Sequence, residues 1–97
     1  MARLEILNPV AKTVEYSVKP AGRLQAIDGT TIGLYWNIKA GGDAALDKTE
    51  ELLRARFPKA KFRRYTGSVG WLMRHCTAED ADRIASEVDA VVGTTAD

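Results

Sequence analysis

The chain has 97 residues, 45% of them apolar, which suits one small domain with one hydrophobic core. Its 14 Lys and Arg nearly balance its 13 Asp and Glu, so there is no general electrostatic reason to expect binding to nucleic acid or to an anionic membrane. The single cysteine, Cys76, excludes an internal disulfide, and no apolar run is long enough for a membrane span or a signal peptide, so we expect a cytoplasmic location.

The first 30 residues carry strand and turn signals. Residues 4–7 form a short apolar run, and residues 13–18 alternate apolar with polar side chains, which predicts two strands. Turn signals rich in Gly and Pro follow them. We interpret residues 1–30 as an N-terminal β arm attached to a core of residues 31–97, all within a single domain.

A strand and a helix open this core. Residues 30–36 are apolar without alternation, as expected of a central parallel strand that is covered on both faces. Residues 43–57 carry apolar side chains at helical spacing, with Asp43 as the expected N-cap and Pro58 as the stop signal. A glycine loop at residues 37–43 joins the two segments.

The second half repeats this order of elements. Residues 61–65 are a predicted strand, and residues 66–70 a loop. Residues 77–80 read as a capping box at the start of a helix. One face of that helix carries the apolar stripe Ala81, Ile84, Ala85 and Val88, and a final strand is expected at residues 90–94.

Strands separated by crossovers of helix length predict a parallel sheet. The expected fold is therefore α/β, a small three-layer structure with a mainly parallel sheet, similar to half of a flavodoxin-like or Rossmann-like fold. In such a sheet the carboxyl ends of the strands gather the loops that bind ligands. The candidate ligand-binding residues at these ends are Asn37, Lys39, Gly41, Gly42, Asp43, Thr66, Ser68, Thr94 and Asp97.

The glycine loop is the best candidate for an anion site. Its glycines let the backbone approach a ligand, Lys39 supplies positive charge, and helix amides can point at a carboxylate or phosphate. A tight turn before a capped helix explains the same residues without a ligand. The loop matches neither the dinucleotide-binding pattern nor the phosphate loop that ends in Gly-Lys-Ser/Thr.

Other reactive or charged side chains point to structural roles. His75 and Cys76 are adjacent and so point in different directions, which disfavours a nucleophile and base pair, and the ligands for a metal site are too few. We expect no metal and no cofactor. The tryptophans are typical of core or subunit contacts, and a solvated strand edge explains the basic run Lys59, Lys61, Arg63 and Arg64.

Several short runs over most of residues 20–97 form a recognisable pattern: Arg23 and Leu24, residues 34–37, Lys39, Gly42 and Asp43 with Leu46, and residues 89–92 with Gly93, Ala96 and Asp97. This pattern resembles the UGSC family. That family is named for a selenocysteine-Gly-Ser-Cys motif, or Cys-Gly-Ser-Cys in its sulfur forms. There the pattern ending in Gly-x-x-x-Asp leads directly into the motif, and then into a helix and another strand. The present chain departs from the family because it contains no such motif.

The resemblance implies a thiol or selenol redox protein whose catalytic residues would follow Asp97 immediately. Because selenocysteine is encoded by the stop codon UGA, we expect a chain truncated before its motif, inactive and lacking a C-terminal helix and strand. A small anionic or thiol-reactive substrate would suit the glycine loop. The alternative is a complete small binding protein or partner subunit that uses the same crevice.

A sheet without its last helix and strand would expose apolar surface and an unpaired edge. We therefore expect a homo-oligomer, a dimer or larger. The arm at residues 4–18 is a candidate for exchange between subunits.

Overall fold

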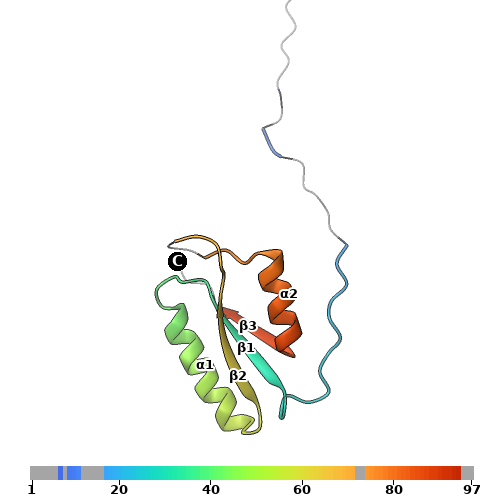
Figure 1. Cartoon of the computed structure of the whole chain (residues 1–97), viewed down its shortest axis with the longest axis vertical. Helices are drawn as coiled ribbons and strands as arrows, with labels where there is room; N and C mark the ends of the chain where they lie inside the picture. The colour runs from blue at the N-terminus through green and yellow to red at the C-terminus, as the bar shows by residue number, and fades with distance from the viewer. Residues whose placement is uncertain (1–6, 8, 12–16, 72–73, 95–97) are drawn as a thin grey trace, which may run out of the picture.

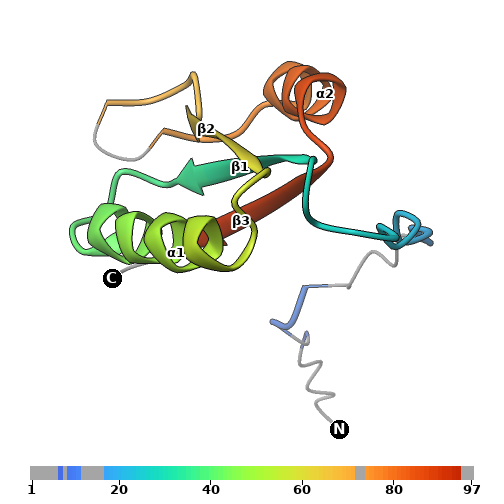
Figure 2. The ribbon, with the colours of Figure 1, turned by 90° about the horizontal axis from the view of Figure 1, so that it is seen from below.

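The computed structural model describes residues 7, 9–11, 17–71 and 74–94. Along this part of the chain the elements are β1 (Thr31–Trp36), α1 (Gly42–Arg56), β2 (Lys61–Thr66), α2 (Ala78–Glu87) and β3 (Ala90–Thr94) (Figure 1). The three strands form one parallel sheet in the order β2-β1-β3. Helix α1 covers one face and α2 the other (Figure 2), which confirms the predicted small α/β fold.

Strand β1 lies at the centre of the sheet because both of its neighbours pair with it. Its alternate residues Ile32 and Leu34 are buried on the α1 side, where they meet Leu46 of α1 and Ala60. Trp36 and Val92 pack against the same cluster. The main core therefore lies between α1 and the sheet, and it fixes the start of α1 beside the ends of β1 and β3.

Asp43 is not the N-cap of α1, so that prediction is wrong. The N-cap is Gly41, which has a left-handed backbone (φ 94°, ψ −27°) and makes no side-chain capping bond. Glycine adopts this conformation at little cost, so the chain turns into the helix one residue before Asp43. Asp43 then lies in the first turn, where its negative charge favours the positive end of the helix dipole.

The predicted capping box at the start of α2 is confirmed. The Thr77 hydroxyl accepts a hydrogen bond from the Asp80 amide, and the Asp80 carboxylate accepts one from the Thr77 amide, both at 3.0 Å. Ile84 is buried, whereas Ala81 and Ala85 of the predicted stripe are exposed. Helix α2 therefore buries a narrower face than its sequence pattern indicates.

Contacts to β2 anchor α2. The Tyr65 hydroxyl donates a hydrogen bond to Glu87 at 2.6 Å, and Arg63 forms an ion pair with the same carboxylate at 3.5 Å. Gly33 of β1 makes room for this packing, since a Cβ there would lie 3.2 Å from the Tyr65 ring and 3.4 Å from Val88. Helix α2 is thus held over β2 and β1 and leaves part of β3 uncovered.

The predicted strands at residues 4–7 and 13–18 lie largely outside the described residues. Residues 23–27 form neither helix nor strand. The basic run from Lys59 to Arg64 has its four charged side chains exposed, as expected of a solvated edge. No helix in the described part of the chain is long and apolar enough to cross a membrane.

Candidate functional site

The candidate site lies at the carboxyl ends of the strands. Trp36, the last residue of β1, is in register with Thr66 at the end of β2 and with Thr94 at the end of β3. The loops that follow β1 and β2 therefore leave the sheet at one edge, and β3 ends at that edge too. In open parallel sheets this edge is the usual position of a ligand crevice.

The glycine loop after β1 is held by its own hydrogen bonds. The carbonyl oxygen of Lys39 accepts hydrogen bonds from the Trp36 indole nitrogen at 2.8 Å and from the Gly42 amide at 3.2 Å. The Asn37 side chain accepts one from the Lys39 amide at 3.3 Å. Ile38 adopts φ 72°, a left-handed conformation that is rare for a β-branched residue and costs free energy. The loop is therefore pinned in one shape at both ends.

Gly42 occupies the tightest position at this edge. A Cβ on Gly42 would lie 2.9 Å from Cδ1 of Trp36 and 3.1 Å from the Thr94 hydroxyl oxygen. That hydroxyl donates a hydrogen bond to the Gly42 carbonyl oxygen at 3.0 Å. The end of β3 is thereby attached directly to the first turn of α1, and only glycine fits between them without displacing a neighbour.

Ser68, another predicted ligand-binding residue, is hydrogen-bonded to Asp80. Its amide and its hydroxyl donate hydrogen bonds to one carboxylate oxygen of Asp80, at 3.0 and 2.7 Å. Asp80 is buried, and the hydrogen bonds from the Thr77 amide and from Ser68 hold the pKa of its carboxyl group well below the usual range. Ser68 thus joins the loop after β2 to the N-terminus of α2.

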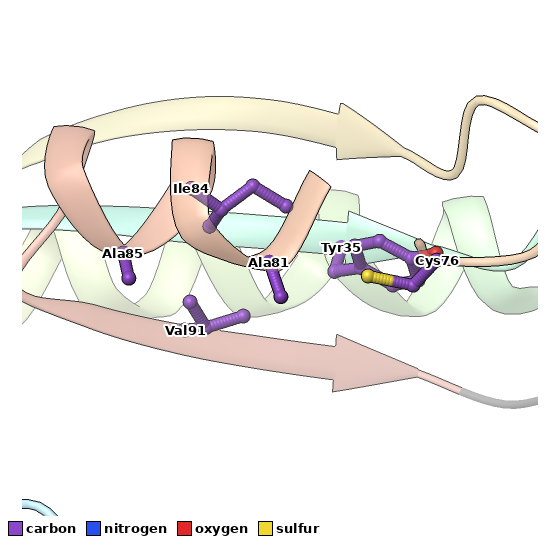
Figure 3. A pocket seen from close by; sticks show the side chains of 6 residues that line it. All are labelled: Tyr35, Cys76, Ala81, Ile84, Ala85 and Val91. Carbon is purple, nitrogen blue, oxygen red and sulfur yellow. The ribbon is translucent and has the colours of Figure 1, made fainter. Parts of the chain in front are cut away.

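An apolar pocket of about 330 Å³ opens between α2 and β3 (Figure 3). Its lining comprises Tyr35, Cys76, Ala81, Ile84, Ala85 and Val91. Tyr35 and the exposed Cys76 lie close together at one end, toward the carboxyl ends of the strands. Burial raises the pKa of the Tyr35 phenol, and the neighbouring Cys76 raises it further.

This pocket was not predicted, because Ala81 and Ala85 share a stripe with Ile84 and are typical of core residues in the sequence pattern. One signal was present: alanine is small, so a helix that contacts a sheet through two alanines leaves space unless the sheet supplies large side chains. Opposite these alanines, β3 offers Val91.

The structure divides the predicted site residues between the two faces of the sheet. The glycine-loop residues and Thr94 gather at the start of α1, whereas Ser68 lies against the start of α2. Thr66 ends β2 in register with Trp36. Asp97 lies outside the described residues. Among the residues with described positions, no three His, Cys, Asp or Glu side chains are grouped closely enough to hold a metal ion.

A comparison with protein families agrees with the sequence pattern. The family model described as UGSC family matches residues 5–97, which is nearly the whole chain. The chain belongs to the UGSC family. No curated protein and no solved structure matches it significantly.

Five of the residues that carry the UGSC resemblance lie at the two opposite ends of the strands. Trp36, Asn37, Lys39 and Gly42 surround the carboxyl edge of the sheet, where the glycine loop meets α1. Asp89 lies at the other end of the sheet, where the strands begin. Its carboxylate accepts a hydrogen bond from the Thr31 amide at 2.9 Å and so fixes the start of β3 beside β1. In this member of the UGSC family, the first group shapes the candidate site and Asp89 supports the sheet.

Proposed function

We propose that this chain is the scaffold of a thiol or selenol redox protein whose nucleophile belongs to a selenocysteine-Gly-Ser-Cys or Cys-Gly-Ser-Cys motif after Asp97. Membership of the UGSC family supports this proposal. So does the sheet topology, which gathers the ends of β1, β2 and β3 at one edge. The chain itself, lacking the motif, should have no redox activity.

The contact between Thr94 and Gly42 is the observation that carries the proposal. It attaches the end of β3 to the first turn of α1, so β3 ends beside the glycine loop. The first amides of an α-helix lack acceptors within the helix, and the helix dipole favours negative charge at that end. A thiolate or selenolate placed there would be stabilised, which lowers the pKa of its conjugate acid and increases its reactive fraction.

The chemistry that fits such a motif is exchange with a disulfide. The chalcogenolate attacks one sulfur of a substrate disulfide, forms a mixed bond to it and releases the other sulfur as a thiolate. The thiolate of the motif cysteine then attacks the mixed bond, closes an internal bond and releases the second substrate thiolate. Two electrons pass from the motif to the substrate, and an external dithiol restores the reduced motif.

The glycine loop is the proposed binding half of the site. Its fixed shape suits a small anionic or thiol-reactive substrate, which could approach the backbone closely at the exposed Gly41. Lys39 and Asn37 are the candidate polar contacts. Asp43 opposes an anion at the same helix end, so we expect binding that depends on the exact position of the negative group.

The test begins with the codon after Asp97 and the reading frame beyond it. The proposal requires an in-frame Gly-Ser-Cys directly downstream, and the full-length protein with Cys in place of selenocysteine should reduce a model disulfide with dithiothreitol as the external dithiol. Replacing the first motif residue with Ser should abolish this activity. Lys39→Met should raise KM for an anionic disulfide, whereas Lys59→Met, on an exposed lysine far from the loop, should not.

A frame without the motif, or activity that survives the Ser replacement, would overturn the redox proposal. The crevice would then be a candidate ligand-binding site without a redox role. Small anions titrated into the chain and followed by amide NMR shifts of residues 37–43 would examine that function.

A further inference from the structure

The two outer strands of the sheet differ in how they are protected. β2 carries Lys61, Arg63 and Arg64, all exposed, and charged side chains on an edge strand discourage pairing with another chain. β3, with the sequence AVVGT, carries no charge, and its outer edge has no strand partner among the described residues. The unprotected edge is therefore that of β3.

Exposed apolar side chains flank this edge on both faces of the sheet. On the α2 face, Val91 is 50% exposed and forms one wall of the apolar pocket (Figure 3). On the other face, Leu52 of α1 is 58% exposed. Within the described helices and strands, these two are the large apolar residues with the most exposed side chains.

The position of Leu52 follows from helix geometry. Asp47 and Glu50 face β2, since both carboxylates lie within ion-pair distance of Arg64, at 2.8 and 3.8 Å. At 3.6 residues per turn, Leu52 is rotated by about 140° from Asp47 and about 160° from Glu50. It therefore lies on the flank of α1 away from β2. Because β2 and β3 lie on opposite sides of β1, this is the β3 side.

That flank continues as a stripe along α1. Ala45 lies four residues before Thr49, and Thr49 lies three residues before Leu52, which is the repeat with which two helices pack against each other. Helix α1 also contacts β3 directly, through the hydrogen bond from Thr94 to Gly42. The stripe thus lies beside the β3 edge.

We infer that two copies of this chain associate through their β3 edges, related by a two-fold axis. Antiparallel pairing of β3 with itself would join the two sheets, satisfy the outer backbone groups and bring the two α1 stripes to face each other. With Val92 on the axis, Val91 lies opposite Gly93 of the partner subunit. A Cβ on Gly93 would meet nothing within 4 Å, so there is room there for the exposed valine.

A second copy suits this edge because each feature complements itself. An uncharged apolar strand meets an identical strand, and a stripe of small and apolar residues meets an identical stripe. The charged β2 edge offers no such match. The surface uses only residues 45–93, and the inference concerns the 97-residue chain without the helix and strand that the redox proposal expects after the motif.

The test is sedimentation velocity and light scattering on the chain between about 1 and about 100 µM. We expect a dimer whose dissociation constant rises at least about tenfold in Val91→Lys and in Leu52→Lys, because loss of a central apolar contact exceeds about 1.4 kcal/mol. Val69→Lys is the matched control, since Val69 is 52% exposed but lies in the loop after β2. It should leave the dimer unchanged.

Both substituted side chains are exposed, so the variants should keep the far-UV spectrum and melting behaviour of a folded monomer. A monomer over the whole concentration range would overturn the proposal and leave the β3 edge to a strand from another polypeptide segment. So would a dimer that survives both Val91→Lys and Leu52→Lys, since its interface would then lie elsewhere, for example at Trp71, which is 88% exposed.

Discussion

The hydroxyl of Thr94 donates a hydrogen bond to the carbonyl oxygen of Gly42 at 3.0 Å, across 52 residues of sequence. It is the described polar contact that ties the end of β3 to α1. Because the carbonyl belongs to the first residue of α1, the bond fixes the direction in which that helix leaves the glycine loop. Two of the following predictions address this junction.

Thr94→Val should destabilise the protein by about 1 kcal/mol. Valine keeps the volume and the β-branched shape of threonine but cannot donate to Gly42, which loses this partner. The free energy of unfolding can be measured by urea denaturation with the m-value held constant. Thr94→Ser retains the hydroxyl and should lose less of the free energy of unfolding. Equal losses of stability in the two variants would mean that the hydrogen bond contributes nothing.

Gly42→Ala should cost about 1–3 kcal/mol, although alanine normally favours a helix. The added methyl group would lie 2.9 Å from the Trp36 ring, so Trp36 or Thr94 must move. Urea denaturation and the Trp36 indole NMR signal would report the loss of stability and the displaced ring. Gly22→Ala is the control, because nothing lies within 4 Å of a Cβ there. Unchanged stability in Gly42→Ala would show that the junction is looser than these distances indicate.

The stability of the protein should fall as the pH drops below about 4, partly through Asp80. Its pKa in the folded state lies below the value of about 3.9 for an unfolded chain, because Thr77 and Ser68 donate hydrogen bonds to the charged carboxylate. The unfolded state therefore binds more protons in this range. The contribution is fully present above the unfolded pKa and is lost as the pH falls toward the folded one.

Two variants separate Asp80 from the other carboxyl groups. Asp80→Asn should lower the urea midpoint at pH 6 and should flatten its decline between pH 6 and pH 3. Ser68→Ala removes only the hydroxyl donor, should cost about 1 kcal/mol at pH 6 and should keep most of the pH dependence. If the urea midpoint falls as steeply with pH in Asp80→Asn as in the parent protein, the acid sensitivity comes from another carboxyl group. Glu87 is the next candidate, because the hydrogen bond from the Tyr65 hydroxyl lowers its pKa.

Tyr35 should ionise at a pH above the ordinary tyrosine value. Burial at the end of the pocket raises its pKa, and Cys76 adds to the shift. Titration of ¹³C-labelled tyrosine by NMR, with Tyr35→Phe for assignment, would follow this group. Cys76→Ser should bring the titration midpoint of Tyr35 closer to the ordinary value and leave the midpoint of Tyr65 unchanged. A Tyr35 midpoint at or below 10 would contradict this arrangement.

Local patterns were sufficient to predict most of the fold. Thr77 and Asp80 predicted the capping box because both partners lie within one turn, and the apolar run before Asn37 predicted a central strand. The N-cap of α1 was assigned wrongly to Asp43. The side-chain rule for N-caps favours Asp, but the observed turn depends on the left-handed backbone of Gly41, which composition alone does not reveal.

The candidate site was predictable in position but not in its contacts. In a parallel sheet, β2 and β3 should have their last residues, Thr66 and Thr94, at the same end of the sheet. The register confirms this, since both residues pair with Trp36. The engagement of Ser68 by Asp80 and the anchoring of α2 through Tyr65 and Glu87 arise from tertiary packing, so neither followed from the sequence pattern. For the same reason the pocket beside β3 was missed.

The central position of β1 has a consequence for how the protein folds during synthesis. Its partner β2 begins at Lys61, and its partner β3 at Ala90, so β1 leaves the ribosome before either is available. The hydrogen bond from the Thr31 amide to the Asp89 carboxylate, at the start of β1 and β3, joins residues 58 apart in the sequence. Closing such long loops is entropically costly and slow compared with forming a hairpin. The nascent chain therefore carries β1 as an unpaired apolar strand until β2 has been made, and residues 31–36 should need chaperone protection during that interval.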